Sequence, residues 1–462
     1  MKSSPWPALL AVFAVVCAAL MGRVIATSPR SALLLLGFTV ILIVVFLTLT
    51  TPILGLYVLV FSMMLSPEIM IAQIPKRAVV VRFDDLLVIL IFLTWFARAA
   101  FRKRVALLKM TPVNLPLYAY VVILLFSTTI GVVRDGASIL VSFFYGLKYL
   151  EYLMIFVLTV NLVETPEQVR GLLKAFFVTA LIVLLYGYYV VLFLNDRPYA
   201  PFDVEAGVTE PASLGGYLLI VIGLATGLIV KQFSGSTVIF RAVIGISSIP
   251  LLFLTQSRAS YFALAMMLVP TLFLEKKRRW FLLVVLLGLM FSMKRIFPHI
   301  YATAQERVMY TFTPMGGPER QFAGQNIVLE QSAESRILFW RRAFKEYLAR
   351  HPLTGHGLGL RPAVEGQIPL LIYETGLVGL FIFLWLMKRI VSEALDLFRR
   401  TTTPELKGLA MGFLIAFFGI FVQSLVNNTF IIIRVMEPFW FLVGLVSVSR
   451  YMQPAPPEKP SR

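Results

Sequence analysis

The sequence predicts an all-α fold, a polytopic bundle of membrane helices. Two observations carry this prediction. The chain has 462 residues, of which 59% are hydrophobic, and its apolar runs of about 18–22 residues recur from end to end, each long enough to cross roughly 30 Å of hydrocarbon. The one long polar stretch spans residues 293–367. We therefore expect membrane helices throughout and one large loop.

The apolar runs define the elements in order. Neighbouring early runs could merge, so we expect about twelve to fourteen spans, with candidates at residues 8–27, 31–50, 53–72, 84–100, 113–133, 138–163, 170–194, 213–231, 238–254, 258–274, 280–297, 368–388, 408–425 and 430–448. This order divides the chain into an N-terminal transmembrane bundle (1–292), a loop (293–367), C-terminal transmembrane helices (368–450) and a tail (451–462).

Basic residues in the short loops set the expected orientation. They fall on one side of the predicted bundle, and the positive-inside rule makes that side cytoplasmic. The relevant clusters are Arg102–Arg104 with Lys109, Lys231 with Arg241, Lys276–Arg279, and Lys388-Arg389 with Arg399, Arg400 and Lys407. The large loop is then extracytoplasmic and the tail cytoplasmic.

The formal net charge of +18 would suggest nucleic-acid binding in a soluble protein. Here the basic residues serve as topology signals and meet anionic lipid head groups, so we expect membrane lipids and no nucleic acid as partners. Cys17 is the only cysteine, which excludes an intramolecular disulfide and a thiolate metal site. The three histidines, His299, His351 and His356, show no metal-ligand spacing. We expect no metal and no cofactor.

The large loop contains one predicted amphipathic helix, Ser335–Arg350. Apolar residues share one stripe of it, and charged residues occupy the rest; the stripe is Ile337, Trp340, Phe344, Tyr347 and Leu348. Ser335 can cap its start, and Pro352 with Gly355 ends it. Such a helix either lies along the membrane surface or covers the end of the bundle.

Arginines on the outer side are candidates for binding an anion. Arg258 ends the sequence Thr255-Gln256-Ser257-Arg258 between two predicted spans, where it is either a snorkelling anchor or an anion ligand. Other arginines on or near that side are Arg82, Arg134, Arg336, Arg361 and Arg434. Several guanidinium groups together would suit a diphosphate, because each can grip phosphate oxygens with two hydrogen bonds.

Carboxylates near the membrane are few. Asp84 and Asp85 open a predicted span beside Arg82, which fits a helix N-terminus with a local ion pair. Lys148 and Glu151 lie three positions apart within a predicted span, so they can pair on one face, in a structural or a functional role. Glu210 precedes the span at 213–231, and Glu437 follows Arg434 on the last span.

Glu365 lies where the large loop meets the next span, after a glycine-rich turn that lets backbone approach a ligand closely. A partly desolvated carboxylate at this position could have a raised pKa and act as a general base. The alternative is a solvated loop glutamate.

Four segments resemble the bacterial O-antigen ligase and O-antigen polymerase superfamily. These are Arg82–Leu87, Lys148–Tyr152, Thr255–Arg258, and the stretch Arg336–Gly379, which contains Pro352-Leu353-Thr354-Gly355-His356-Gly357 and Glu374-Thr375-Gly376-Leu377-Val378-Gly379. The resemblance covers most of residues 80–450. Each motif is weak singly, but their order and placement are fairly specific.

The resemblance implies a metal-independent, inverting glycosyltransferase of a bacterial inner membrane with its active site on the periplasmic face. Its donor would be a polyprenyl-diphosphate-linked oligosaccharide and its acceptor a saccharide or a lipid. Polysaccharide-export or chain-length proteins would be further partners. Family ligases carry a histidine eleven residues before the first glycine of the last motif; here that position is Glu365, which favours polymerisation over ligation.

We therefore expect Glu365 as general base and Arg258 as the residue that stabilises the leaving diphosphate. Arg336, Arg361, Arg82 and Glu210 are candidate substrate-binding residues. Two alternatives remain. A transporter or flippase of lipid-linked glycans would predict two pseudo-symmetric halves, which the chain lacks. A non-catalytic assembly subunit would fit the missing histidine.

Overall fold

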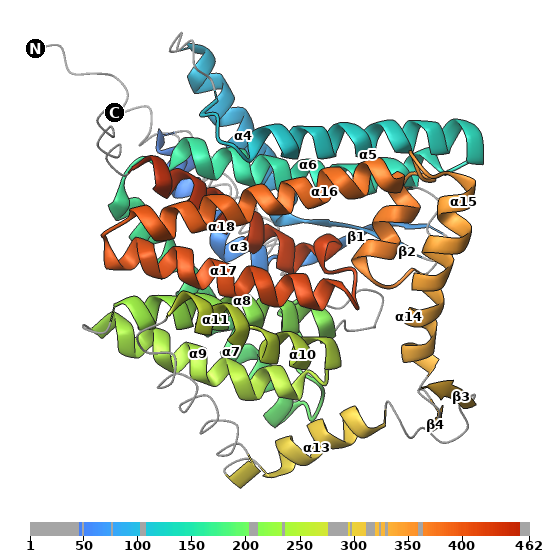
Figure 1. Ribbon diagram of the computed structural model, residues 1–462. Helices are drawn as coiled ribbons and strands as arrows, with labels where there is room; N and C mark the ends of the chain where they lie inside the picture. The colour runs from blue at the N-terminus through green and yellow to red at the C-terminus, as the bar shows by residue number, and fades with distance from the viewer. Residues whose placement is uncertain are drawn as a thin grey trace, which may run out of the picture.

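The computed structural model confirms the all-α class (Figure 1). It describes residues 46–48, 50–74, 77–101, 108–202, 211–232, 236–275, 294–295, 298–310, 319–322, 325–328, 331–358 and 364–452. Within these residues, seven helices are long and apolar enough to cross a membrane. The predicted span 8–27, nearly all of 280–297 and most of 31–50 lie outside the described residues.

Most helices of the bundle fall where the apolar runs predicted them. They are α3 (Pro52–Leu65), α4 (Phe83–Phe101), α5 (Asn114–Asp135), α6 (Ile139–Leu162), α7 (Pro166–Phe193), α8 (Pro211–Lys231), α9 (Ser236–Leu254), α10 (Arg258–Met266), α11 (Leu268–Leu274), α16 (Gln367–Arg400), α17 (Pro404–Ser424) and α18 (Ile433–Tyr451). The predicted span 258–274 is divided into α10 and α11, because Pro270 has no backbone N–H to continue the helical ladder.

The predicted span 53–72 is wrong. Helix α3 ends at Leu65, and β1 (Glu68–Ile74) pairs with β2 (Arg77–Arg82) as an antiparallel hairpin that extends through the bundle (Figure 1). Ser66 precedes Pro67 and takes an extended conformation, with φ −77° and ψ 124°. Proline restricts the residue before it to this region, so the helix ends here although apolar residues continue.

The large loop contains α13 (Pro298–Met309), the hairpin β3 (Glu319–Phe322) with β4 (Gln325–Val328), and the predicted amphipathic helix. This helix runs from α14 (Gln331–Arg342) through a π-helical turn (Ala343–Tyr347) into α15 (Leu348–Arg350). It crosses one end of the bundle instead of running along it (Figure 1). Ile337 and Phe344 remain 48% and 53% exposed, as expected for a helix that lies on a membrane surface.

We call this end of the bundle the loop end. Helix α5 ends there at Asp135, α10 begins there at Arg258, and α16 begins there at Gln367. The opposite end carries Lys231 at the end of α8 and Arg450 at the end of α18.

Helices α8 and α17 pack with their backbones in direct contact. Each carries two glycines four residues apart, Gly223 and Gly227 on α8 and Gly408 and Gly412 on α17. A Cβ atom at Gly227 would lie 2.1 Å from the nitrogen of Gly412, and one at Gly412 would lie 2.7 Å from Cα of Leu224. Small residues at this spacing let membrane helices approach closely, which gains packing energy that apolar burial alone does not supply in lipid.

Candidate functional site at the loop end

Glu365 forms an ion pair with Arg336 at the loop end. Nε of Arg336 donates to Oε2 of Glu365 over 2.8 Å, and the two side chains are 25% and 44% exposed. Arg336 comes from α14, and Glu365 stands two residues before α16. The structure thus brings together two of the predicted site residues, and the accessible carboxylate can still meet a ligand.

Backbone contacts fix the position of Glu365. Nδ2 of Asn428 donates to the Val364 carbonyl over 2.6 Å, and the N–H of Phe430 donates to Oε1 of Gln367 over 3.1 Å. Gly366, at φ +95°, occupies a conformation that favours glycine. The connection between α17 and α18 therefore contacts the backbone before Glu365 and a side chain after it.

Arg258 is the first residue of α10, after a hairpin in which Gln256 has a positive φ of 55°. Its helix is attached to the end of α17, where Nε2 of Gln423 donates to Oγ of Ser260 over 2.9 Å. Gln423 lies five residues before Asn428, which contacts the residue next to Glu365. Ser260, two residues after Arg258, and Val364, next to Glu365, thus contact the same region at the end of α17, although 107 positions separate Arg258 from Glu365 in sequence (365 − 258).

Two other predicted substrate-binding residues, Glu210 and Arg361, lie outside the described residues.

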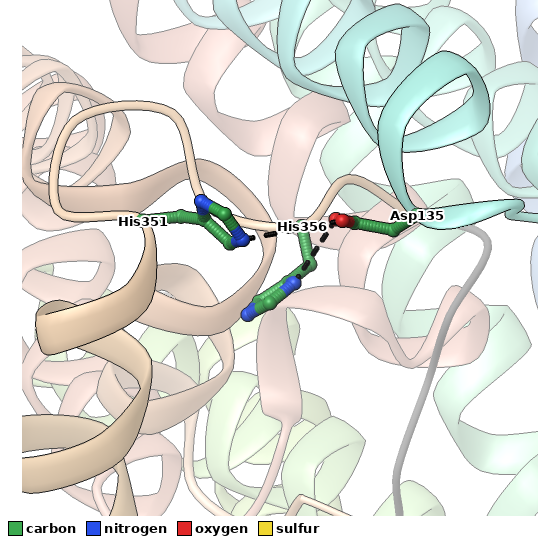
Figure 2. Close-up of side chains that lie close together, drawn as sticks. All are labelled: Asp135, His351 and His356. Atoms are coloured by element: carbon green, nitrogen blue, oxygen red, sulfur yellow. Dashed lines mark hydrogen bonds and ion pairs between the residues drawn. The ribbon is translucent and has the colours of Figure 1, made fainter.

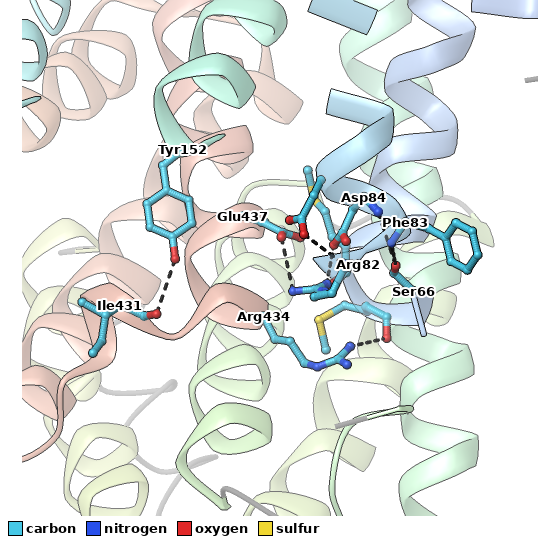
Figure 3. A network of polar contacts seen from close by, with 11 residues as sticks. Ser66, Arg82, Phe83, Asp84, Tyr152, Ile431, Arg434 and Glu437 are labelled. Carbon is cyan, nitrogen blue, oxygen red and sulfur yellow. Dashed lines mark hydrogen bonds and ion pairs between the residues drawn. The ribbon is translucent and has the colours of Figure 1, made fainter. Parts of the chain in front are cut away.

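Arg82 and Asp84 belong to a buried ion cluster (Figure 3). Arg82 is 2% exposed, pairs with Asp84, and lies 3.3 Å from Oε1 of Glu437. It also donates to the Met63 carbonyl over 2.9 Å, and Arg434 donates to the Met64 carbonyl over 3.1 Å. These carbonyls belong to the last turn of α3, which ends inside the bundle, so the guanidinium groups satisfy acceptors that the helix leaves without intrahelical partners.

The start of α4 is stabilised in the same region. Oγ of Ser66 accepts from the N–H of Phe83 over 2.8 Å, and Oδ2 of Asp85 accepts from the N–H of Arg82 over 2.8 Å. Glu151 on α6 is buried and is an electrostatic neighbour of Asp85, Asp84 and Arg82. Lys148 is half-buried on the same helix. Arg82, Asp84 and Glu151 are therefore buried inside the bundle.

The sequence reasoning missed a second polar cluster at the loop end, Asp135 with His351 and His356 (Figure 2). Nδ1 of His356 lies 3.1 Å from Oδ2 of Asp135, and Nε2 of His351 lies 3.9 Å from Oδ1. Asp135 ends α5, 221 positions before His356, so no local spacing could reveal the contact. Burial lowers the pKa of His351, and the nearby charge of Arg134 acts in the same direction.

Backbone hydrogen bonds tie this cluster to the beginning of α16. The N–H groups of His356 and Gly357 donate to the carbonyls of Tyr373 and Glu374 over 2.7 and 2.9 Å. Helix α16 is kinked at Gly376, where φ is +64° and ψ −161°. Because of the kink, these carbonyls lack partners within α16. Residues 351–358, the segment after α15, donate to them instead.

We predict that Gly131→Val detaches this segment from α5. A Cβ atom at Gly131 would lie 1.9 Å from the carbonyl oxygen of His356, so one of the two backbones must move. Amide hydrogen exchange in residues 351–358 should become faster, because the bonds to Tyr373 and Glu374 weaken. Gly146→Val on α6 is the matched control, since a Cβ there meets nothing within 4 Å. Equal exchange in both variants would contradict the prediction.

Comparison with known proteins agrees with the resemblance seen in the sequence. Residues 242–384 match the family model described as O-antigen ligase. No curated protein matches the chain. The matched segment contains Arg258, Arg336 and Glu365. Residues 242–384 of this multi-pass membrane protein are therefore similar to the O-antigen ligase family.

Proposed function

We propose that this chain is an inner-membrane glycosyltransferase that moves a glycan from a polyprenyl diphosphate to a saccharide or lipid acceptor. The observation that carries the proposal is the ion pair of Glu365 with Arg336 at the loop end, within the segment that matches the O-antigen ligase family. A carboxylate and a guanidinium group side by side are the groups that a reaction with a hydroxyl nucleophile and a diphosphate leaving group needs.

In the proposed reaction, the Glu365 carboxylate accepts the proton of the acceptor hydroxyl as its oxygen attacks the anomeric carbon. The bond from that carbon to the diphosphate oxygen breaks, and negative charge develops on the leaving polyprenyl diphosphate. Arg258, the first residue of α10, and Arg336, the ion-pair partner of Glu365, stabilise this charge in the proposed reaction. One direct displacement inverts the anomeric configuration, and none of these steps requires a metal.

Polymerisation is favoured over ligation, because Glu365 occupies the position at which family ligases carry a histidine. The basic residues support a periplasmic site. Lys231 and Arg450 close α8 and α18 at the end opposite the loop end, and positive charge marks the cytoplasmic side of inner-membrane proteins. The donor head group would then meet Glu365 on the periplasmic side.

A glycan-size ladder tests the proposal. Cells that lack this gene are complemented at matched expression with wild type, Glu365→Gln or Arg258→Ala. Loss of a general base lowers rates by about 10²–10⁴-fold, and loss of a group that stabilises developing charge lowers them by about 10²–10³-fold. Both variants should therefore lose long polymer while single repeats accumulate on the polyprenyl carrier. Glu306→Gln and Arg341→Ala are matched controls on exposed positions of the same loop, and both should keep the normal ladder.

The ladder also separates the alternatives. Free polymer of normal length that fails to become attached would indicate ligation. Carrier-linked repeats that glycosidases added on the periplasmic side cannot reach would indicate a flippase. A normal ladder with Glu365→Gln would contradict the proposed base and favour a non-catalytic assembly subunit.

A further inference from the structure

The cluster of Asp135, His351 and His356 takes no part in the proposed transfer step. One donor atom from each residue lies within 4.8 Å of the other two. The imidazole rings of His351 and His356 are 4.6 Å apart and nearly perpendicular, at 83°. Figure 2 shows the three side chains converging from the end of α5 and from the segment after α15. Two imidazoles and one carboxylate thus face a common point.

This set of donors selects a particular class of ion. Imidazole nitrogen and carboxylate oxygen together suit zinc and its neighbours, whereas magnesium and calcium prefer oxygen alone. Zinc binds such ligands at about 2.0–2.2 Å, which places tetrahedral ligand atoms roughly 3.3 Å from one another. The 3.1 Å between Nδ1 of His356 and Oδ2 of Asp135 already fits that spacing. Nε2 of His351, whose side chain is 25% exposed, lies 3.9 Å from Oδ1 of Asp135 and would have to move closer to share the ion.

We propose that Asp135, His351 and His356 bind a zinc-class divalent cation that fastens the segment after α15 to the end of α5. A tetrahedral ion held by these three residues would take water or another ligand in its fourth position. This site is separate from Glu365 and does not depend on the proposed transfer chemistry.

Arg134 competes with the ion for Asp135. Its Nε and one terminal nitrogen grip the two carboxylate oxygens over 3.0 and 2.8 Å, and the same terminal nitrogen donates to the Gly355 carbonyl over 2.7 Å. A bound dication would repel the guanidinium group and take at least one of these oxygens. Arg134 is 33% exposed, so it can turn toward solvent. Removal of Arg134 should therefore strengthen metal binding.

The ion would join three elements. Asp135 belongs to α5, both histidines belong to the segment after α15, and the backbone of that segment is hydrogen-bonded to Tyr373 and Glu374 of α16. Helix α16 begins two residues after Glu365. Zinc would thus limit the movement of the loop end while leaving the transfer step to other residues.

The test uses full-length protein in detergent. The purification tag is removed, and the protein is treated with chelator. It is then titrated with zinc chloride alone in a calorimeter. Wild type should bind one ion per chain. His351→Ala, His356→Ala and Asp135→Asn should each weaken binding by about 100-fold or more, since loss of even an outer-shell partner costs 10–100-fold. Arg134→Ala should bind several-fold more tightly than wild type. His299→Ala, which changes the remaining histidine, should match wild type.

A second readout covers variants that fold poorly. Zinc should raise the thermal unfolding midpoint of wild type and of Arg134→Ala, but not that of His351→Ala. Magnesium should not change the midpoint of any of the three proteins. The absence of saturable zinc binding in both wild type and Arg134→Ala would overturn the proposal. Binding that is unchanged in His351→Ala and His356→Ala would also overturn it.

Discussion

Arg82→Met is expected to remove most of the folded protein. The substitution deletes the cation between Asp84 and Glu437, both of which are 0% exposed, and it removes the hydrogen bond to the Met63 carbonyl. Breaking a buried ion pair by deleting one partner costs about 3–5 kcal/mol, because the remaining charge stays buried without compensation. That cost is comparable with the whole stability of many proteins.

The measurement is the fraction of extracted protein that elutes as a monodisperse peak, together with its thermal unfolding midpoint. Arg400→Met is the matched control, because Arg400 is 49% exposed and lies 4.0 Å from Asp396. Such an exposed pair contributes at most about 1 kcal/mol. The double variant Arg82→Met/Glu437→Gln should recover part of the loss, because it removes charge of both signs. Similar midpoints for Arg82→Met and Arg400→Met would show that the cluster does not stabilise the bundle.

Gly412→Leu is expected to separate α8 from α17. The added Cβ would lie 2.7 Å from Cα of Leu224 and 2.9 Å from the Gly223 carbonyl oxygen, and neither backbone atom can move without its whole helix. Overpacking of a core costs about 1–3 kcal/mol or more. Here we expect the upper part of that range, because the contact joins two backbones.

Helix α17 also carries Gln423, whose bonds fix the beginning of α10 near Arg258. Gly412→Leu should therefore lower both the thermal midpoint and the glycan-transfer activity. Gly146→Leu is the control, since a Cβ at Gly146 meets no atom within 4 Å. A normal midpoint for Gly412→Leu would mean that the two helices can move apart without penalty.

The two effects differ in kind. At Arg82 the cost is electrostatic and arises because α3 ends inside the bundle, where its last carbonyls need donors. At Gly412 the cost is steric, because lipid chains are as apolar as side chains and helix association depends on close packing.

Within the described residues, the sequence by itself determined most of the spans. No backbone polar group can remain unsatisfied in lipid, so a run of apolar residues that is long enough becomes a helix whatever its neighbours are. The amphipathic helix after Gln331 and the turn before Arg258 could be predicted for the same local reasons. The exception was the run after Leu65, where Pro67 ended a helix that hydrophobicity alone would have continued.

Only the tertiary structure decided which helices and side chains lie next to one another. Hydrophobicity sets the depth of a residue in the membrane, but it does not set which helix stands beside it. For this reason Glu437 could be seen near Arg434, but not beside Arg82, which lies 355 positions earlier (437 − 82). The pairing of Glu365 with Arg336, and of Asp135 with His356, depends in the same way on how α5, α14 and α16 pack, because side chains this far apart in sequence meet only after the helices have assembled.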